Sequence, residues 1–332
     1  MTAQPFYHLR PNKFIDRQLF ISMLIKLQSH LEFSKYCYVG FGSYLFDDFK
    51  IMHNNLAISN MISLECDPEI KKRAEFNKPL KCIKIKSETS TDFIDYFGHD
   101  ENNYIFWLDY TNPADIGVQF SDYCSLLNQL EAGDVIRITL NANPSSLGEK
   151  KDKKGEELWD MRLKELKSRI GQYLPLDVKK DQVVTKKYPL LLLSALKNGT
   201  NQTLKESAVQ NLFPVPILSS IYADGQQMIT LSILILDDHN REKDILTSLY
   251  PQFKGDEKIV EKVKDLVWNS PNKISIPSLS TKEILTMNSM LPVENAKETL
   301  KEEFSFIFED EEKIDNYLNF YKIYPYFREV SF

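Results

Sequence analysis

A buried-strand pattern followed by a glycine turn is the feature that most limits how this chain can fold. Residues 36–49 read Tyr-Cys-Tyr-Val-Gly-Phe-Gly-Ser-Tyr-Leu-Phe-Asp-Asp-Phe, and residues 61–67, after a short helical pattern, read Met-Ile-Ser-Leu-Glu-Cys-Asp. An apolar run, two glycines, a helix and a second apolar run that ends in a carboxylate are typical of the first half of a nucleotide-binding α/β sheet. The segment therefore predicts parallel strands joined by a crossover helix.

The glycine turn and Glu65 also predict a nucleoside-binding site. Gly40 and Gly42 would let the backbone pass close to a ligand, and a carboxylate after the second strand can bind both hydroxyls of a ribose. The third glycine of the dinucleotide pattern is absent, because Leu45 and Phe46 occupy that region. A pyrophosphate is thus disfavoured, and a nucleoside without phosphates, such as S-adenosylmethionine, fits better. The alternative is an ordinary strand-to-helix turn beside a solvated Glu65.

The composition is that of a folded protein with a large core, and its charge leaves room for a local basic groove. Of 332 residues, 42% are hydrophobic and 12% aromatic, enough for a large core, and the formal charge of −6 argues against a general nucleic-acid binder. The four cysteines are scattered and the histidines lack metal-ligand spacing, so we expect reduced thiols, no zinc or other metal, and a cytoplasmic protein. Neither a signal peptide nor a membrane span is readable.

Short apolar runs alternate with helical patterns from residue 35 to about residue 141. We expect parallel strands at Tyr36–Gly40, Met61–Glu65, Cys82–Lys86, Tyr104–Asp109 and Asp134–Leu140. Two further apolar runs, Val215–Ala223 and Met228–Leu236, flank Asp224 and Gly225, which together are a strong hairpin signal. These elements predict a Rossmann-like α/β sheet of about seven strands, with the hairpin as its antiparallel edge.

The patterns divide the chain into three parts. A helical cap over residues 1–34 contains one amphipathic helix, whose apolar face carries Phe20, Leu24, Leu27 and Leu31. A sheet domain over residues 35–240 contains a helical insertion at about residues 145–213, where helical spacing joins Trp159, Leu163, Leu166 and Ile170. A helical extension covers residues 241–332, and a capping box at Ser280 and Glu283 predicts the start of one of its helices.

Several motifs resemble those of a bacterial O-methyltransferase family. They are Leu9–Arg17, Tyr38–Ser43, Asp48–Phe49, His53, Met61–Glu65, Arg73, Phe76–Asn77, Leu108–Thr111 and Tyr324–Phe327. The resemblance extends over most of the chain, and the N-terminal half carries the more specific motifs. It implies a class I, Rossmann-like methyltransferase fold with S-adenosylmethionine as the cofactor.

The place of each residue in the family pattern implies how the cofactor would bind. The turn Gly40–Ser43 would line its methionine part, Glu65 with the neighbouring Cys66 would hold the ribose, and Glu88 or Thr89 would flank the adenine.

The resemblance also places candidate reactive residues at the end of the fourth strand. Such enzymes keep residues there that face the transferring methyl group, which implies this position for Asp109 and Tyr110, with Asp109 also near the cofactor. Asp109 is a candidate general base, and the alternative is that it caps the following helix or binds backbone.

A basic cluster of Arg10, Lys13 and Arg17 stands at the start of the N-terminal helix, where the helix dipole disfavours cations. These side chains could pair with the cofactor's carboxylate, with Asp47 or Asp48, or with an anionic substrate; a surface cluster is the alternative. We predict that Arg10 or Lys13 closes the pocket containing Asp109.

The leading hypothesis is an S-adenosylmethionine-dependent methyltransferase whose acceptor is a small molecule, a nucleic acid or a protein. The alternative is a non-catalytic subunit that uses the same fold to bind a ligand or partner within a larger bacterial complex, for instance a defence system. Tyr317, Tyr321 and Tyr326 would suit an interface with a protein partner or a second copy, although packing of the C-terminal helices is the commoner role for such residues.

Overall fold

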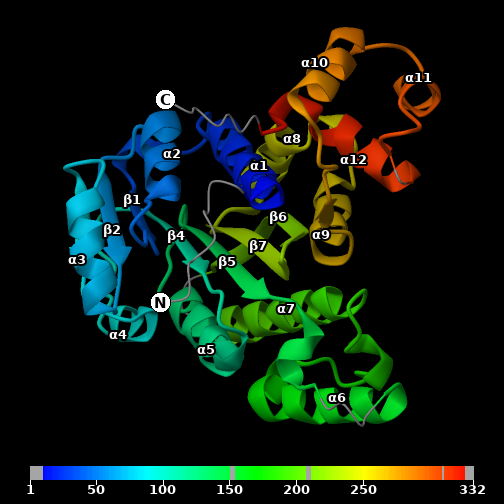
Figure 1. Cartoon of the computed structure of the whole chain (residues 1–332). Helices are drawn as coiled ribbons and strands as arrows, with labels where there is room; N and C mark the ends of the chain where they lie inside the picture. Colours follow the sequence, from blue (N-terminus) through cyan, green and yellow to red (C-terminus); the bar gives the residue numbers. More distant parts are fainter. Residues whose placement is uncertain (1–9, 150–153, 207–210, 309, 326–332) are drawn as a thin grey trace.

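The computed structural model of the chain describes residues 10–149, 154–206, 211–308 and 310–325. Leu9, Tyr326 and Phe327, which take part in the sequence arguments above, lie outside these ranges. Within them, eight strands form one mixed sheet in the order β3-β2-β1-β4-β5-β7-β6-β8 (Figure 1). The predicted Rossmann-like α/β fold is confirmed.

The five predicted parallel strands are confirmed to within a residue or two. They are β1 (Cys37–Gly40), β2 (Asn60–Leu64), β3 (Ile83–Lys86), β4 (Tyr104–Asp109) and β5 (Val135–Asn141). The chain runs outward from β1 through β2 to β3 and then returns to place β4 on the other side of β1. Ligands of open α/β sheets bind at such a switch point, beyond the carboxyl ends of the strands.

The predicted hairpin forms, but it is not the edge of the sheet. Strands β6 (Phe213–Asp224) and β7 (Gln226–Leu236) are antiparallel and turn at Gly225, whose φ of +98° suits glycine. Beyond them, the short strand β8 (Asn272–Ile274) pairs parallel with β6. The expectation that the hairpin forms the edge was wrong, since β8 lies beyond it. Strand β8 has only three residues, two of them exposed, so no apolar run in the sequence predicts it.

Helices cover both faces of the sheet. In Figure 1, α1 (Pro11–Leu27), α2 (Asp47–Leu56) and α8 (His239–Leu249) lie above it, and α5 (Ile116–Leu127) and α7 (Tyr188–Glu206) lie below. Helix α3 (Pro68–Asn77) begins at a proline and is capped by the Asp67 carboxylate, and α4 (Ser90–Asp95) begins with a capping box at Thr89 and Asp92. None of the helices in the described part of the chain is long and apolar enough to span a membrane.

The segment after β5 contains α6 (Glu156–Ile170), which buries Leu166 and Ile170 on its predicted stripe, and α7, which packs on β6 and β7. The C-terminal helices are α9 (Ile259–Asn269), α10 (Thr281–Met290), α11 (Ala296–Glu303) and α12 (Glu311–Phe320). The capping box at Ser280 and Glu283 is confirmed. Short 3-10 helices occur at Phe33–Lys35, Pro113–Asp115, Pro144–Leu147, Gly171–Tyr173, Lys180–Gln182, Pro251–Phe253 and Tyr321–Ile323.

A second hydrophobic cluster joins the C-terminal helices to the sheet. It gathers Tyr222 and Met228 from the hairpin, Ile15 from α1 and apolar side chains of α10 to α12. Tyr317 is fully buried in this cluster, so packing, rather than an exposed interface, is its role. The division into three parts by sequence remains a prediction, but packing links all three.

Helix α1 is attached to the sheet by a buried ion pair. Arg137 on β5 donates from Nη2 to Asp16 Oδ2 at 2.5 Å and from Nη1 to Ser232 Oγ at 2.6 Å, and the paired side chains are fully buried. The guanidinium also lies 4.6 Å from the ring centre of Phe20 and 4.8 Å from that of Trp107. Because a buried charge needs a partner, this arrangement fixes the position of α1 along β5.

The start of α1 is capped by the hairpin rather than by its own sequence. Arg10, at the N-cap position, makes no side-chain capping bond. The Asp224 carboxylate instead accepts from the backbone N–H groups of Asn12 at 3.2 Å and Lys13 at 2.8 Å, and the Asn12 amide donates to Ala223 O at 2.9 Å. An acid at this end also suits the helix dipole. The turn that the sequence marks as a hairpin therefore also determines where the N-terminal helix begins.

We predict that Asp16→Asn destabilises the fold strongly, because it leaves the Arg137 guanidinium buried without a counter-charge. The expected loss is about 3–5 kcal/mol, measured as a lower melting temperature by circular dichroism. Glu69→Gln is the control, since Glu69 pairs with Lys72 on the exposed surface of α3, where such pairs contribute under about 1 kcal/mol. Equal melting temperatures for the two variants would contradict the role given to Asp16.

Candidate functional site

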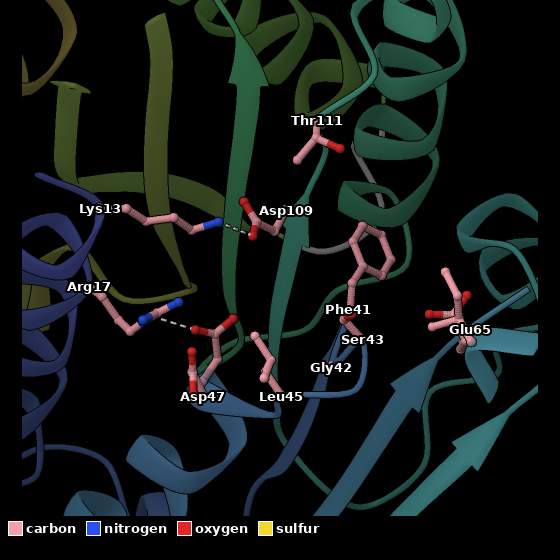
Figure 2. Close-up of a pocket in the computed structure, with 12 residues that line it drawn as sticks. Lys13, Arg17, Phe41, Gly42, Ser43, Leu45, Asp47, Glu65, Asp109 and Thr111 are labelled. Carbon is pink, nitrogen blue, oxygen red and sulfur yellow. Dashed lines mark hydrogen bonds and ion pairs between the residues drawn. The ribbon is translucent and has the colours of Figure 1, made fainter. Parts of the chain in front are cut away.

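Three adjoining cavities lie at the carboxyl edge of the sheet. The first, which we call the glycine-turn cavity, has a volume of about 200 Å³. It is lined by Lys13, Arg17, Phe41, Gly42, Ser43, Leu45, Asp47, Asp48, Glu65, Ile70, Asp109 and Thr111. Figure 2 shows Lys13 and Arg17 reaching in from α1, with Glu65 on the far side of the glycine turn. Of the ten residues that the sequence predicted for the cofactor, the cavity brings together five: Phe41, Gly42, Ser43, Glu65 and Asp109.

Two ion pairs form the wall on the α1 side. The Lys13 ammonium donates to Asp109 Oδ2 at 2.6 Å, and the side chains are 4% and 12% exposed. Arg17 Nε lies 2.5 Å from Asp48 Oδ1, although its N–H is not directed at that oxygen, so this contact is electrostatic rather than a hydrogen bond. The pairing of the basic cluster with Asp48, one of the alternatives left open by the sequence, is observed (Figure 2).

The environments of the two carboxylates differ. Burial opposes ionisation of Asp109, but the neighbouring Lys13 ammonium more than offsets it and lowers the pKa of this carboxyl below its ordinary value. Burial raises the pKa of Asp48 despite the opposing charge of Arg17. Asp109 is therefore ionised at neutral pH, and its lowered pKa makes it a weak proton acceptor.

One oxygen of Asp109 is available to a ligand. Oδ1 is buried and has no hydrogen-bond partner among the described residues. Thr139 lies close enough to favour the charged form of Asp109, and its hydroxyl accepts from Trp107 Nε1 at 3.1 Å. A buried carboxylate oxygen without a partner is costly unless a donor or cation reaches it. The site thus favours a cationic or hydrogen-bond-donating ligand.

The glycines are required by the protein's own packing. A Cβ added at Gly42 would lie 2.6 Å from both the Phe46 ring and Ser63 Oγ, and one at Gly40 would lie 2.8 Å from the Tyr38 hydroxyl. The Gly42 N–H donates to Ser63 Oγ at 3.1 Å. Gly40 does not line the cavity, so its predicted contact with a ligand has no support from its position, whereas Gly42 lines it directly.

Glu65 follows β2 and forms the far wall of the glycine-turn cavity. Burial raises the pKa of this half-buried carboxyl, and the hydrogen bond from the Asp67 N–H, at 3.0 Å, limits the rise. Its neighbour Cys66 is exposed and lines none of the cavities described here.

The second cavity, the Tyr110 cavity, is about 360 Å³ and shares Phe41, Asp109 and Thr111 with the first. It is further lined by Thr89, Ser90, Thr91, Tyr110, Asn112, Asp115, Val118, Gln119 and Asp122. The Tyr110 hydroxyl donates to Asp122 Oδ2 at 2.7 Å and lies 3.1 Å from Ser90 Oγ, and burial raises its pKa well above the ordinary value. Thr89 therefore lies at a cavity wall, whereas Glu88 faces Lys86 at 3.9 Å and does not.

The third cavity, the hairpin cavity, is about 220 Å³ and shares Lys13 and Thr111 with the first. Its lining consists of Arg10, Lys13, Thr111, Asn141, Tyr222, Asp224, Gln226 and Met228. Arg10 thus lies here and not at the glycine turn. No group of three or more His, Cys, Asp or Glu side chains suited to a metal ion occurs within the described ranges.

Sequence reasoning missed the residues that later elements contribute. The hairpin cavity includes Asn141 from β5, Tyr222 from β6 and Gln226 from β7. The two hairpin residues lie more than a hundred positions after the glycine turn in the sequence. The signal that could have found them is position, since Asn141 ends a strand whose carboxyl end faces the site and the other two flank the predicted turn. Thr111, two residues after β4, carries the same signal.

We predict that Asp109→Asn lowers the melting temperature, because it leaves the Lys13 ammonium buried beside a neutral amide. The expected cost is about 3 kcal/mol or more. The double variant Lys13→Met/Asp109→Leu should recover most of it, since well-packed apolar residues replace a buried ion pair at little cost. A double variant no more stable than Asp109→Asn would show that the carboxylate is held by something other than the pair.

The chain resembles a "putative O-methyltransferase" from Klebsiella pneumoniae (TM-score 0.37, 12% identity, 70% of this chain and 83% of that one). It also resembles an O-methyltransferase from Bacillus cereus in complex with SAH (TM-score 0.37, 9% identity, 66% and 80%) and TomG of Streptomyces achromogenes in complex with SAM (TM-score 0.35, 9% identity, 70% and 92%).

These similarities are too low to carry a conclusion; the observed strand order is what establishes the fold. No curated protein matches the chain. A family model described as "Putative O-methyltransferase" matches residues 5–332. The chain therefore belongs to this O-methyltransferase family, as the sequence motifs had indicated.

Proposed function

We propose that this protein is an S-adenosylmethionine-dependent methyltransferase and that the cofactor binds in the glycine-turn cavity. The observation that carries the proposal is the joining of the glycine turn, Glu65 and the Asp109 carboxylate in one cavity at the switch point of the sheet. Ligands of this fold bind at that edge, with an acid after the second strand on the ribose. Membership in an O-methyltransferase family supports the same reading.

The charges of the cavity match the proposed cofactor. Four carboxylates line it, those of Asp47, Asp48, Glu65 and Asp109, against the two cations of Lys13 and Arg17. S-adenosylmethionine carries a sulfonium, an ammonium and one carboxylate, so its net charge is positive and an excess of carboxylates in the cavity favours it. In this proposal Glu65 binds the ribose, Gly42 and Ser43 border the methionine part, and Thr89 lies on the adenine side.

Methyl transfer depends more on the alignment of donor and acceptor than on a general acid or base. Methyl transfer is an in-line displacement at carbon, and holding donor and acceptor in one geometry supplies much of the acceleration. With its lowered pKa, Asp109 is better suited to attract the sulfonium than to remove a proton, and Lys13 fixes its orientation. The Tyr110 hydroxyl is occupied by Asp122 and Ser90, so we assign it to the wall of the site. No observation favours the non-catalytic alternative.

We predict that Glu65→Ala weakens binding of S-adenosylmethionine by roughly 1.5–3 kcal/mol, because a charge-assisted contact to the ribose hydroxyls is lost. Isothermal titration calorimetry measures the change. Glu69→Ala, which removes an exposed carboxylate from the next helix, is the matched control and should bind normally. Unchanged affinity in a folded Glu65→Ala variant would reject the ribose assignment.

The pH dependence of binding gives a second test of Glu65. Burial raises the pKa of this carboxyl above its ordinary 4.5, so it gains its proton earlier on acidification than an exposed glutamate would. The protonated form is a poorer acceptor for ribose hydroxyls. We expect affinity to decline as the pH falls toward that raised pKa, and Glu65→Gln to bind weakly with a smaller decline, since Asp48 in the same cavity also has a raised pKa. Parallel pH curves for the two proteins would speak against the assignment.

Activity is tested with S-adenosylmethionine labelled on the methyl group. Incubation with fractionated cell extract should transfer label to one fraction, whose nature names the acceptor class. Asp109→Asn, assayed at a temperature at which it stays folded, should weaken cofactor binding and lower the rate at saturating cofactor, because the carboxylate that attracts the sulfonium is lost, and Glu69→Ala should keep the parental rate. Binding of the cofactor without transfer to any fraction would favour the non-catalytic subunit instead.

A further inference from the structure

We propose that the hairpin cavity binds the methyl acceptor, and that the acceptor is a small molecule recognised through a carboxylate or phosphate group. This inference rests on the proposed function, because it needs a methyl donor in the neighbouring cavity. Of the three acceptor classes that the sequence left open, a small molecule, a nucleic acid and a protein, it selects the small molecule.

Position is the first argument. The hairpin cavity and the glycine-turn cavity have Lys13 and Thr111 in common, so these side chains border both cavities. Figure 2 shows Lys13, Asp109 and Thr111 together on one side of the cofactor site. A molecule in the hairpin cavity would therefore approach the donor from the edge formed by β4 and β5, across from Glu65.

Unsatisfied hydrogen-bonding groups are the second argument. Tyr222 is 3% exposed and Asn141 is 7% exposed, and both line the cavity. The Tyr222 hydroxyl has no hydrogen-bond partner within the described residues. Asn141 Oδ1 accepts from the Asn143 N–H at 3.0 Å, which directs its amide N–H groups elsewhere, and these too lack a partner in the described chain. Because both side chains line the cavity, their O–H and N–H groups are donors that it can present to a ligand.

The charges are the third argument. Arg10 and Lys13 line the cavity; the Lys13 ammonium also pairs with Asp109, and the single carboxylate of the lining, Asp224, accepts from the backbone N–H groups of Asn12 and Lys13. Gln226 Oε1 accepts from Asn143 Nδ2 at 2.9 Å, so its amide group can offer N–H donors to a ligand. A wall that combines the Arg10 guanidinium with N–H and O–H donors favours a ligand rich in acceptor oxygens, and charge-assisted hydrogen bonds to an oxyanion are the strongest of this type.

Size selects a small molecule, because a cavity of about 220 Å³ holds a compact ligand. The formal charge of −6 also argues against a general nucleic-acid binder.

The test uses the full-length protein saturated with S-adenosylhomocysteine and three probes: inorganic phosphate, malonate and the uncharged glycerol. Calorimetry should detect binding of phosphate, of malonate, or of both, which distinguishes a phosphate from a carboxylate as the recognised group, and no binding of glycerol. Tyr222→Phe and Arg10→Gln should each weaken the anion about tenfold or more, the loss of roughly one charge-assisted hydrogen bond. Tyr96→Phe, on a fully solvated ring that is 90% exposed, is the matched control and should bind normally.

Three results would overturn the inference. Failure of both anions to bind the saturated protein excludes an oxyanion site. Equal affinity in wild type, Tyr222→Phe and Arg10→Gln places the anion elsewhere. Competition between phosphate and S-adenosylhomocysteine shows that the cations hold the carboxylate of the cofactor itself. The proposed function fails separately, through absence of S-adenosylhomocysteine binding in the wild type, so the two failures are distinguishable.

Discussion

The pairing of buried charges beneath α1 is the constraint on which the site depends. Lys13, Asp16 and Arg17 project from one face of the helix, and each meets an opposite charge from a different element: β4, β5 and α2. Thr230 on β7 adds a hydrogen bond to Asp16 Oδ1 at 3.0 Å. Because an unpaired charge is not tolerated in such a position, shifting the helix by one residue would break all three pairs. The helix therefore has a single register.

That register determines the walls of two cavities. Lys13 belongs to both the glycine-turn cavity and the hairpin cavity, and its ammonium holds Asp109 where β4 ends. The N-terminal helix is thus part of the site and not only a cover above it. The same arrangement explains why Asp109 stays ionised although it is almost completely buried, and why its chemistry is better described as attraction of a cation than as proton removal.

The C-terminal region supports the site from the other side. Asn12 accepts from the Ile276 N–H at 2.9 Å and donates to the hairpin, and the Tyr222 and Met228 side chains of the hairpin cavity pack into the cluster formed with α10 to α12. Residues more than two hundred positions apart therefore define one end of the hairpin cavity. A ligand that binds there would contact side chains whose positions depend on the packing of the C-terminal helices as well as on the sheet.

The sequence by itself determined the parallel strands, the glycine turn, the hairpin and the strand-end positions of Glu65 and Asp109, because apolar runs, glycines and caps are local signals. It also contained the family motifs. Only the tertiary structure decided that Lys13 pairs with Asp109, that Asp224 caps α1, that Arg10 lies at the hairpin cavity and Cys66 at none, and that β8 forms the edge. Each of these depends on which elements meet in space, and a contact between residues a hundred or more positions apart leaves no periodic trace in the chain.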